Sequence, residues 1–129
     1  MATIKNIFFF ILLIFFLFNS VQAEPISGNL VTLQVLDKVT SRLETIEIKV
    51  GNVVKFGPLK IEIFMCKKRP PEEVPEDFVL MRIIDEISEN NFERVFQGWM
   101  ISSSPTVTPF EHPTYDVWIK DCKIAKESE

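Results

Sequence analysis

The chain has 129 residues, of which 47% are hydrophobic and 25% charged, and its formal net charge at pH 7 is −4. This acidic balance argues against nucleic-acid binding, which needs a basic surface that displaces counterions. It argues equally against a simple polybasic attachment to anionic lipid.

The first 23 residues are predicted to be a cleavable signal peptide. Lys5 supplies a positive charge, and residues 7–18 are all apolar, a run shorter than the roughly 20 residues that a membrane span needs. Val21-Gln22-Ala23 places small or slim residues before a cut, so cleavage is expected after Ala23; an uncleaved membrane anchor is the alternative. The remaining residues, 24–129, form one domain and keep 13 of the 14 basic residues against 18 acidic ones, a net charge of −5.

Cys66 and Cys122 are the two cysteines of the chain, and an even number in an exported protein predicts a disulfide. Closing a loop of about 57 residues would stabilise the domain by about 4 kcal/mol, because it lowers the entropy of the unfolded chain. A redox or metal-binding thiol pair is the alternative. It is disfavoured because C-x-x-C spacing is absent and His112 is the only histidine.

Alternating apolar residues predict strands in the first half of the domain. Residues 29–36 and 42–50 are expected to pair as a hairpin with one solvent-facing side, joined by a polar turn. A short run at 53–56 lies between two glycine-containing turns, and a third long strand begins at Leu59 and ends near Cys66.

The segment KKRPPEEVPED, residues 67–77, is predicted to be a stiff, exposed loop. Its prolines lack amide donors and force extended backbone on the preceding residues, which excludes a helix or a central strand. A docking surface is the alternative, with Glu72, Glu73 and Glu76 as its candidate residues.

The second half of the domain is expected to contain three more strands and one long loop. The dense apolar run at 78–87 fits a strand or a helix by periodicity and is predicted to be a buried strand. Residues 92–101 are a strand in which Gly98 marks a bulge or a close approach of another backbone. The loop at 102–113 contains three prolines, and the last strand covers 115–122.

Trp99 and Trp118 are predicted to belong to the core of this small domain. Trp118 shares strand parity with Cys122 and is therefore expected to pack over the disulfide. A stacking platform that includes Tyr115 and binds a glycan or an apolar ligand is the alternative.

About seven short strands without a long amphipathic helix in the domain predict an all-β fold. The expected architecture is a small antiparallel β-sandwich or barrel held by one disulfide.

Several sequence blocks resemble the alphaproteobacterial family known as domain of unknown function 2155. They are LDKVTSR, VKFGPLKI, CKKRPPEEVPED, VFQGWMISSSP and EHPTYDVWIKDCK, which lie between residues 36 and 123. The blocks GWM-x-x-SSP and EHP-x-YDVW are distinctive together, and the resemblance covers nearly all of the predicted mature chain. It implies an exported periplasmic protein of a Gram-negative cell, and it implies no enzymatic activity.

Catalysis and metal binding have weak support in the sequence. The serines at 102–104 could combine with His112 and Asp116 into a Ser-His-Asp arrangement, but there is no G-x-S-x-G motif and serines are common in loops. Metal binding could draw on Glu111, His112, Asp116 and Asp121, whose spacing matches no known ligand pattern. We therefore predict a protein that is not an enzyme, with no cofactor and no metal.

The leading functional prediction is a non-enzymatic periplasmic binding or envelope assembly factor that docks another envelope protein. Its candidate binding residues lie in or beside the two proline-containing loops: Glu72, Glu73 and Glu76 near the first, and Glu111, His112 and Tyr115 near the second. Because about one strand length separates the loops, we expect two separate surfaces at opposite ends of the sheet. The alternatives are a small envelope hydrolase that uses His112 and a structural envelope component. The mature form is predicted to have no membrane span and no nucleic-acid partner.

Overall fold

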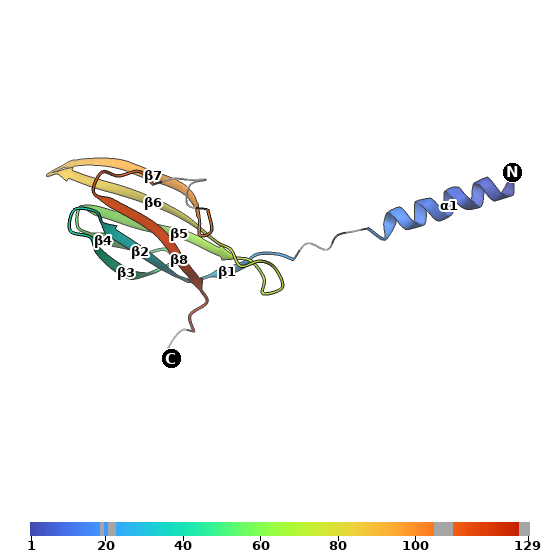
Figure 1. The fold of residues 1–129 in the computed structure, drawn as a ribbon, viewed down its shortest axis with the longest axis horizontal. Helices are drawn as coiled ribbons and strands as arrows, with labels where there is room; N and C mark the ends of the chain where they lie inside the picture. Colours follow the sequence, from blue (N-terminus) through green and yellow to red (C-terminus); the bar gives the residue numbers. More distant parts are fainter. Residues whose placement is uncertain (19, 21–22, 105–109, 127–129) are drawn as a thin grey trace.

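The computed structural model describes residues 1–18, 20, 23–104 and 110–126. Within them it contains one helix and eight strands: α1 (Ala2–Phe16), β1 (Ile26–Gly28), β2 (Leu30–Asp37), β3 (Arg42–Lys49), β4 (Val53–Phe56), β5 (Leu59–Lys68), β6 (Asp77–Ser88), β7 (Asn91–Ile101) and β8 (Tyr115–Lys123). The strands form two layers, and α1 stands apart from them with none of its residues buried (Figure 1).

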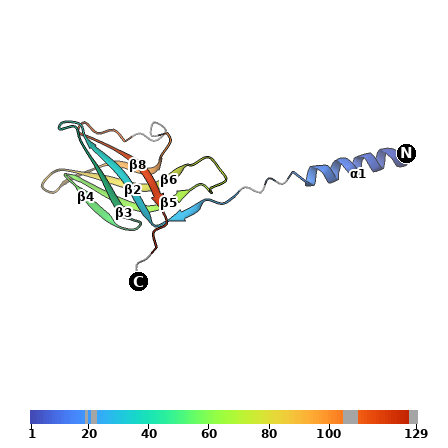
Figure 2. The ribbon, with the colours of Figure 1, turned by 60° about the horizontal axis from the view of Figure 1, so that its bottom comes forward.

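The two sheets are both antiparallel and differ in size. The large sheet has the order β1-β5-β6-β7, and β4 pairs with the same edge of β5 as β1. The small sheet has the order β3-β2-β8 and crosses the large sheet, teal and red against green to orange in Figure 2. This arrangement confirms the predicted all-β antiparallel sandwich. The short strand β1 is an addition that the sequence did not indicate.

The core lies between the sheets and is built by the alternation of side chains along each strand. The inward residues of the large sheet are Leu59, Ile61, Ile63, Cys66, Val79, Met81, Ile83 and Met100, and those of the small sheet are Val31, Leu33, Val35, Ile48, Val117, Ile119 and Cys122. All of them lie between residues 31 and 122. Because α1 contributes no buried residue, residues 24–129 contain the whole core.

The N-terminal helix α1 ends at Phe16 and contains most of the apolar run at 7–18. Among the described residues, no helix has both the length and the apolar character needed to cross a membrane. Residues 21 and 22 of the predicted cleavage site lie outside the described residues, and cleavage stays a prediction.

Cys66 and Cys122 form the predicted disulfide, with their Sγ atoms 2.10 Å apart, and it joins the large sheet to the small one. A β-bulge precedes each cysteine. Phe64 is the extra residue in β5, and Lys120 is the extra residue in β8. Each bulge reverses the parity of the strand, so that both cysteines turn inward.

The expected position of Trp118 is wrong for the same reason. The bulge at Lys120 places Trp118 on the opposite face of β8 from Cys122, where its Nε1–H donates to Gln34 Oε1 at 2.8 Å. Neither tryptophan belongs to the buried core: Trp118 is half-buried, and Trp99 is 39% exposed on the outer face of the large sheet.

Gly98 has a role other than the one expected, and Gly28 has a role that the sequence did not indicate. Gly98 pairs in register with Met81, while the extra residue of the β7 bulge is Val95. A Cβ at Gly98 would have open space, so no other backbone approaches it; its φ of +146° is the feature that favours glycine. Gly28, in β1, lies against the disulfide, and a Cβ there would collide with both sulfur atoms.

Candidate functional site

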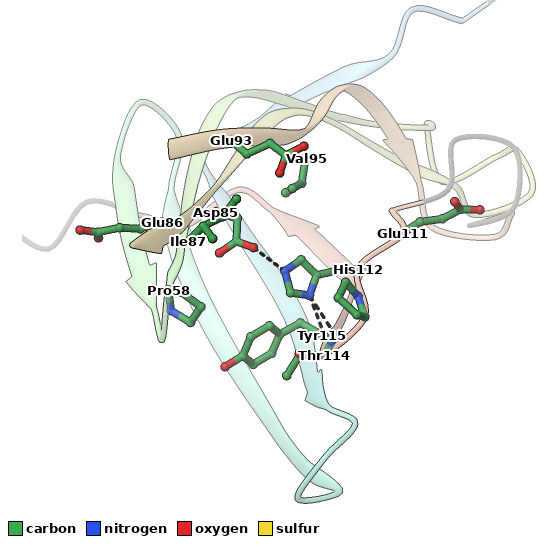
Figure 3. Close-up of a pocket in the computed structure, with 11 residues that line it drawn as sticks. Pro58, Asp85, Glu86, Ile87, Glu93, Val95, Glu111, His112, Thr114 and Tyr115 are labelled. Atoms are coloured by element: carbon green, nitrogen blue, oxygen red, sulfur yellow. Dashed lines mark hydrogen bonds and ion pairs between the residues drawn. The ribbon is translucent and has the colours of Figure 1, made fainter. Parts of the chain in front are cut away.

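A cleft of about 590 Å³ opens at the end of the sandwich opposite the disulfide. The tip of the β6–β7 hairpin forms one wall, and the segment that leads into β8 forms the other (Figure 3). Its lining residues are Pro58, Asp85, Glu86, Ile87, Glu93, Val95, Glu111, His112, Pro113, Thr114 and Tyr115. The structure therefore brings three of the predicted binding residues, Glu111, His112 and Tyr115, to one place.

Hydrogen bonds at both ring nitrogens hold the His112 side chain in place. Its Nδ1 accepts the backbone N–H groups of Thr114 and Tyr115 at 3.1 and 3.2 Å, so Nδ1 carries no proton. The ring proton is consequently on Nε2, which donates to Oδ2 of Asp85 at 2.7 Å. The side chains of His112 and Asp85 are only 7% and 15% exposed. This imidazole is fixed in position, with both ring nitrogens used in hydrogen bonds within the protein.

Two aromatic rings contact the imidazole of His112. The ring of Phe110 stacks on it with a centroid distance of 6.0 Å, and the ring of Tyr115 lies 5.4 Å away. Tyr115 also makes an edge-on contact with Phe56 of the large sheet at 5.9 Å, and its hydroxyl lies beside Gly57. These contacts tie the start of β8 to the large sheet and keep the cleft wall in place.

Lys38 anchors the same segment from the small sheet. Its Nζ donates to the backbone oxygen of His112 at 2.6 Å and lies 3.4 Å from a carboxylate oxygen of Asp116. A second hollow, of about 330 Å³, lies between Lys38 and the His112 segment. Asp116 thus binds lysine instead of histidine.

The Ser-His-Asp combination considered from the sequence does not assemble. Ser102 and Ser103 bind Glu76 just before the other end of β6, about nine residues or roughly 30 Å along the chain from Asp85. The carboxylate at His112 comes from Asp85 of β6. The geometry offers no nucleophile next to this imidazole from the set that the sequence suggested.

The cleft is acidic. Asp85 binds His112, and Glu86 forms an ion pair with Lys55 at 3.0 Å, which leaves Glu93 and Glu111 as exposed carboxylates at its rim. In Figure 3, Glu86 and Glu111 turn outward, whereas Glu93 lies on the β7 side near Asp85.

Within the described part of the chain, no group of three or more His, Cys, Asp or Glu side chains is arranged to hold a metal ion. Asp121, one of the metal candidates, lies at the other end with Lys68, 3.7 Å away.

The first proline-containing loop lies at the disulfide end. Glu72 and Glu73 are exposed there, whereas Pro70 is buried. Glu76 is not free for a partner, because its carboxylate accepts hydrogen bonds from the Ser102 hydroxyl at 2.8 Å, the Ser103 backbone N–H at 2.8 Å and the Ser103 hydroxyl.

The surroundings of Glu76 and Asp77 shift the pKa values of these two carboxyl groups in opposite directions. Partial burial acts to raise the pKa of Glu76, but the hydrogen bonds from Ser103 and Ser102 outweigh it, and the pKa of this carboxyl lies below its ordinary value of 4.5. Burial raises the pKa of Asp77 above 3.8, although the nearby Lys68 acts in the opposite direction.

The two loops are therefore not separated in the way that the sequence suggested. The second loop begins beside the first, through Ser102 and Ser103, and ends at the opposite end of the sandwich at His112. Residues 105–109, which include two of its three prolines, lie outside the described residues. Glu72 and Glu73 are at one end, and Glu111, His112 and Tyr115 are at the other.

Sequence reasoning missed Asp85 and Glu93. A signal for Asp85 exists, because it continues the parity of the buried residues Val79, Met81 and Ile83, and an acidic side chain at an inward position needs a partner. Glu93 is exposed, and only the pairing of β6 with β7 places it opposite Asp85.

Comparison with known proteins gives the family and no activity. The model of the family described as "Uncharacterized protein conserved in bacteria (DUF2155)" matches residues 31–122. A protein of Rickettsia prowazekii (strain Madrid E), itself described as uncharacterized, is 37% identical over 87 residues. The alignment covers 67% of this chain and 56% of that protein, so the chain spans only about half the length of this relative. No solved structure matches the chain.

The family match runs from the first core residue of β2 to the second cysteine of the disulfide, and it therefore includes both sheets and the His112 cleft. It confirms the resemblance drawn from the sequence blocks. The chain belongs to the DUF2155 family of conserved bacterial proteins.

Proposed function

We propose that this protein is a non-enzymatic binding or assembly factor of the bacterial envelope, and that it docks another envelope protein through the His112 cleft. The observation that carries the proposal is the fixed state of His112: both ring nitrogens are used in internal hydrogen bonds, beside a cleft whose rim carries free carboxylates. Such a histidine shapes a surface instead of transferring protons.

The charge of the cleft supports a basic partner. Asp85, Glu86, Glu93 and Glu111 line it, and Lys55 offsets only Glu86. Glu93 and Glu111 are exposed at the rim and carry no ion pair with another described residue, so their charges are open to cationic groups of a partner. We therefore propose that the docked segment of the partner carries lysine or arginine side chains.

Export is part of the same proposal. The apolar run at 7–18 and the Val21-Gln22-Ala23 site support a signal peptide that is removed to release residues 24–129 into the periplasm. Intact-mass measurement of the exported protein is expected to give the mass of 24–129. A full-length mass in the membrane fraction would instead support the anchored form.

The docking test uses two matched charge reversals. The Glu93→Lys, Glu111→Lys variant changes the rim of the cleft, and the Glu72→Lys, Glu73→Lys variant makes the same change of charge in the exposed loop at the other end. Both are expected to keep the fold, because all four side chains are exposed. Cross-linking in intact cells, followed by purification, is expected to recover the partner at least about tenfold less well with the cleft variant only.

The outcomes separate the candidate functions. Equal recovery by the two variants and the wild-type protein would reject the cleft as the docking site. Loss with the Glu72 and Glu73 variant alone would move the site to the first loop. An envelope phenotype with no captured protein in any form would favour a structural envelope component.

A further inference from the structure

The outer face of the large sheet collects positive charge. Cross-strand pairing puts the cations Lys55, Lys60, Lys67, Arg82 and Arg94 on this side, because their paired neighbours alternate with the buried residues of β5 and β6. The same pairing places two carboxylates there, Glu62 and Glu86. The face is thus net positive, although residues 24–129 carry a net charge of −5.

The same face exposes large apolar side chains. Phe64 and Met65 are each 40% exposed, Trp99 is 39% exposed and Phe92 is 50% exposed. Leu80 pairs with both Met65 and Trp99, so these three residues form one row across β5, β6 and β7. An apolar row on the solvent side of a sheet is unusual in a sandwich, where that side is normally polar.

Cations and rings are interleaved on this surface, which we call the cationic aromatic face. The Lys60 ammonium lies 4.8 Å from the centre of the Phe92 ring, and the Arg82 guanidinium lies 5.3 Å from that of Phe64. Aromatic rings that sit at headgroup depth, next to cations that reach phosphate groups, are the pattern of proteins that lie on a membrane surface.

We propose that the cationic aromatic face binds the surface of an anionic lipid bilayer. Charge complementarity supports an anionic occupant, and the apolar row supports one that also offers a hydrocarbon boundary, which a soluble acidic partner lacks. The proposal uses a different surface from the His112 cleft and does not depend on it.

The net charge of the sequence argues against lipid attachment, whereas this proposal rests on the local charge of one face. Net charge averages over both faces and both ends of the molecule. Strand pairing gathers Lys55, Lys60, Lys67, Arg82 and Arg94 on one side and leaves the free carboxylates of the cleft at the end of the sandwich.

The two tryptophans make a direct test possible, because Trp99 is on the outer face of the large sheet and Trp118 on that of the small sheet. The protein to use is residues 24–129, which contain the whole core and lack the apolar helix. A Trp118→Phe variant reports from Trp99 alone, and Trp99→Phe reports from Trp118 alone. We expect a blue shift of the Trp99 emission with vesicles of equal phosphatidylcholine and phosphatidylglycerol, no shift with phosphatidylcholine alone, and no shift of Trp118 in either case.

A pair of charge reversals tests the contribution of the cations. Lys60→Glu with Arg94→Glu alters the cationic aromatic face, and Arg42→Glu with Lys49→Glu makes the same change of charge on β3 of the small sheet. Each cation near an anionic surface contributes about fivefold to binding, so the first variant is expected to partition onto the mixed vesicles at least roughly 25-fold less than wild type. The control is expected to stay within a few-fold of wild type, and added salt is expected to weaken wild-type binding.

Three results would overturn the proposal: no partition of the wild-type protein onto anionic vesicles, equal losses in the two variants, or a blue shift of Trp118 in place of Trp99. Capture of a soluble acidic protein by this face, without vesicle binding, would assign the face to a protein partner and would also overturn it.

Discussion

At one end of the sandwich the two sheets are joined by the Cys66–Cys122 disulfide, and at the other end by His112 and the rings of Phe110, Tyr115 and Phe56. The first end is closed by a covalent bond between the sheets, and the hydrogen bonds of Glu76 link the start of β6 to the end of β7 within the large sheet. The second is held by one nearly buried hydrogen-bonded pair and aromatic packing, and it borders the cleft. The molecule thus has one end closed by a covalent bond and one end held by non-covalent contacts beside the cleft.

Removing the covalent closure is expected to have the largest effect on stability. The bond closes a loop between cysteines 56 positions apart, so replacing both with alanine is expected to lower the free energy of unfolding by about 4 kcal/mol. The thermal midpoint of residues 24–129 would fall by roughly 20 °C, measured by circular dichroism. A midpoint equal to that of the oxidised wild type would mean that the other contacts alone hold this end closed.

The His112→Ala substitution removes the hydrogen bonds at the open end, and we expect it to lower the free energy of unfolding by about 3 kcal/mol. The substitution leaves the Asp85 carboxylate and the amides of Thr114 and Tyr115 without their partner. Chemical denaturation measures the change. Glu111→Ala, at the neighbouring exposed position, serves as control and is expected to change stability by less than about 0.5 kcal/mol. Equal effects of the two substitutions would show that the His112 contacts do not hold the segment.

The Gly28→Ala substitution tests how closely β1 packs against the disulfide. A Cβ at residue 28 meets both sulfur atoms, so we expect overpacking to cost about 2 kcal/mol. Only part of the cost should disappear when both cysteines are alanine, because the two sulfur atoms are then absent while the contact with the backbone oxygen of Lys123 remains. A double-mutant cycle from thermal unfolding gives this coupling. A cost that is unchanged without the sulfur atoms would assign the whole effect to the Lys123 backbone.

Glu76→Gln is expected to have a smaller effect, about 1 kcal/mol at pH 7, because the carboxylate is partly exposed to solvent. The pKa of Glu76 is lowered in the folded state, so its contribution is present above 4.5 and is lost as the pH falls through the lowered value. Unfolding midpoints of variant and wild type should therefore converge at acid pH. A difference that persists there would assign the effect to packing.

Asp77 neighbours Glu76 but has a raised instead of a lowered pKa. The Asp77→Asn substitution is expected to have the smallest effect on stability. Burial raises the pKa of Asp77, so its ionised form is disfavoured in the folded state, and stability from this group is greatest below 3.8 and falls as the pH rises through the folded value. The neutral amide is expected to raise the thermal midpoint slightly at pH 7 and to leave it unchanged at acid pH. A lower midpoint at pH 7 would mean that the attraction between Asp77 and Lys68 dominates.

The sequence by itself was enough for the strands of the core, the family and the disulfide. Alternation at Ile61 and Ile63 or at Val79 and Met81 is a local property of the chain, and two cysteines in one predicted exported domain have a single intramolecular pairing. These features depend on neighbours in sequence or on counting, and so they can be predicted without coordinates.

Only the tertiary structure decided which face each side chain occupies and which residues meet. The bulges at Phe64 and Lys120 reverse strand parity, so they turn the cysteines inward and Trp118 away from them. Asp85 and His112 lie 27 positions apart and come together only because the segment before β8 returns to the end of β6. A bulge is one extra residue in a pairing between distant strands, and a side-chain contact across two sheets depends on the register of both. Neither has a signature in the local sequence, because both are set by which strands pair and how they are aligned.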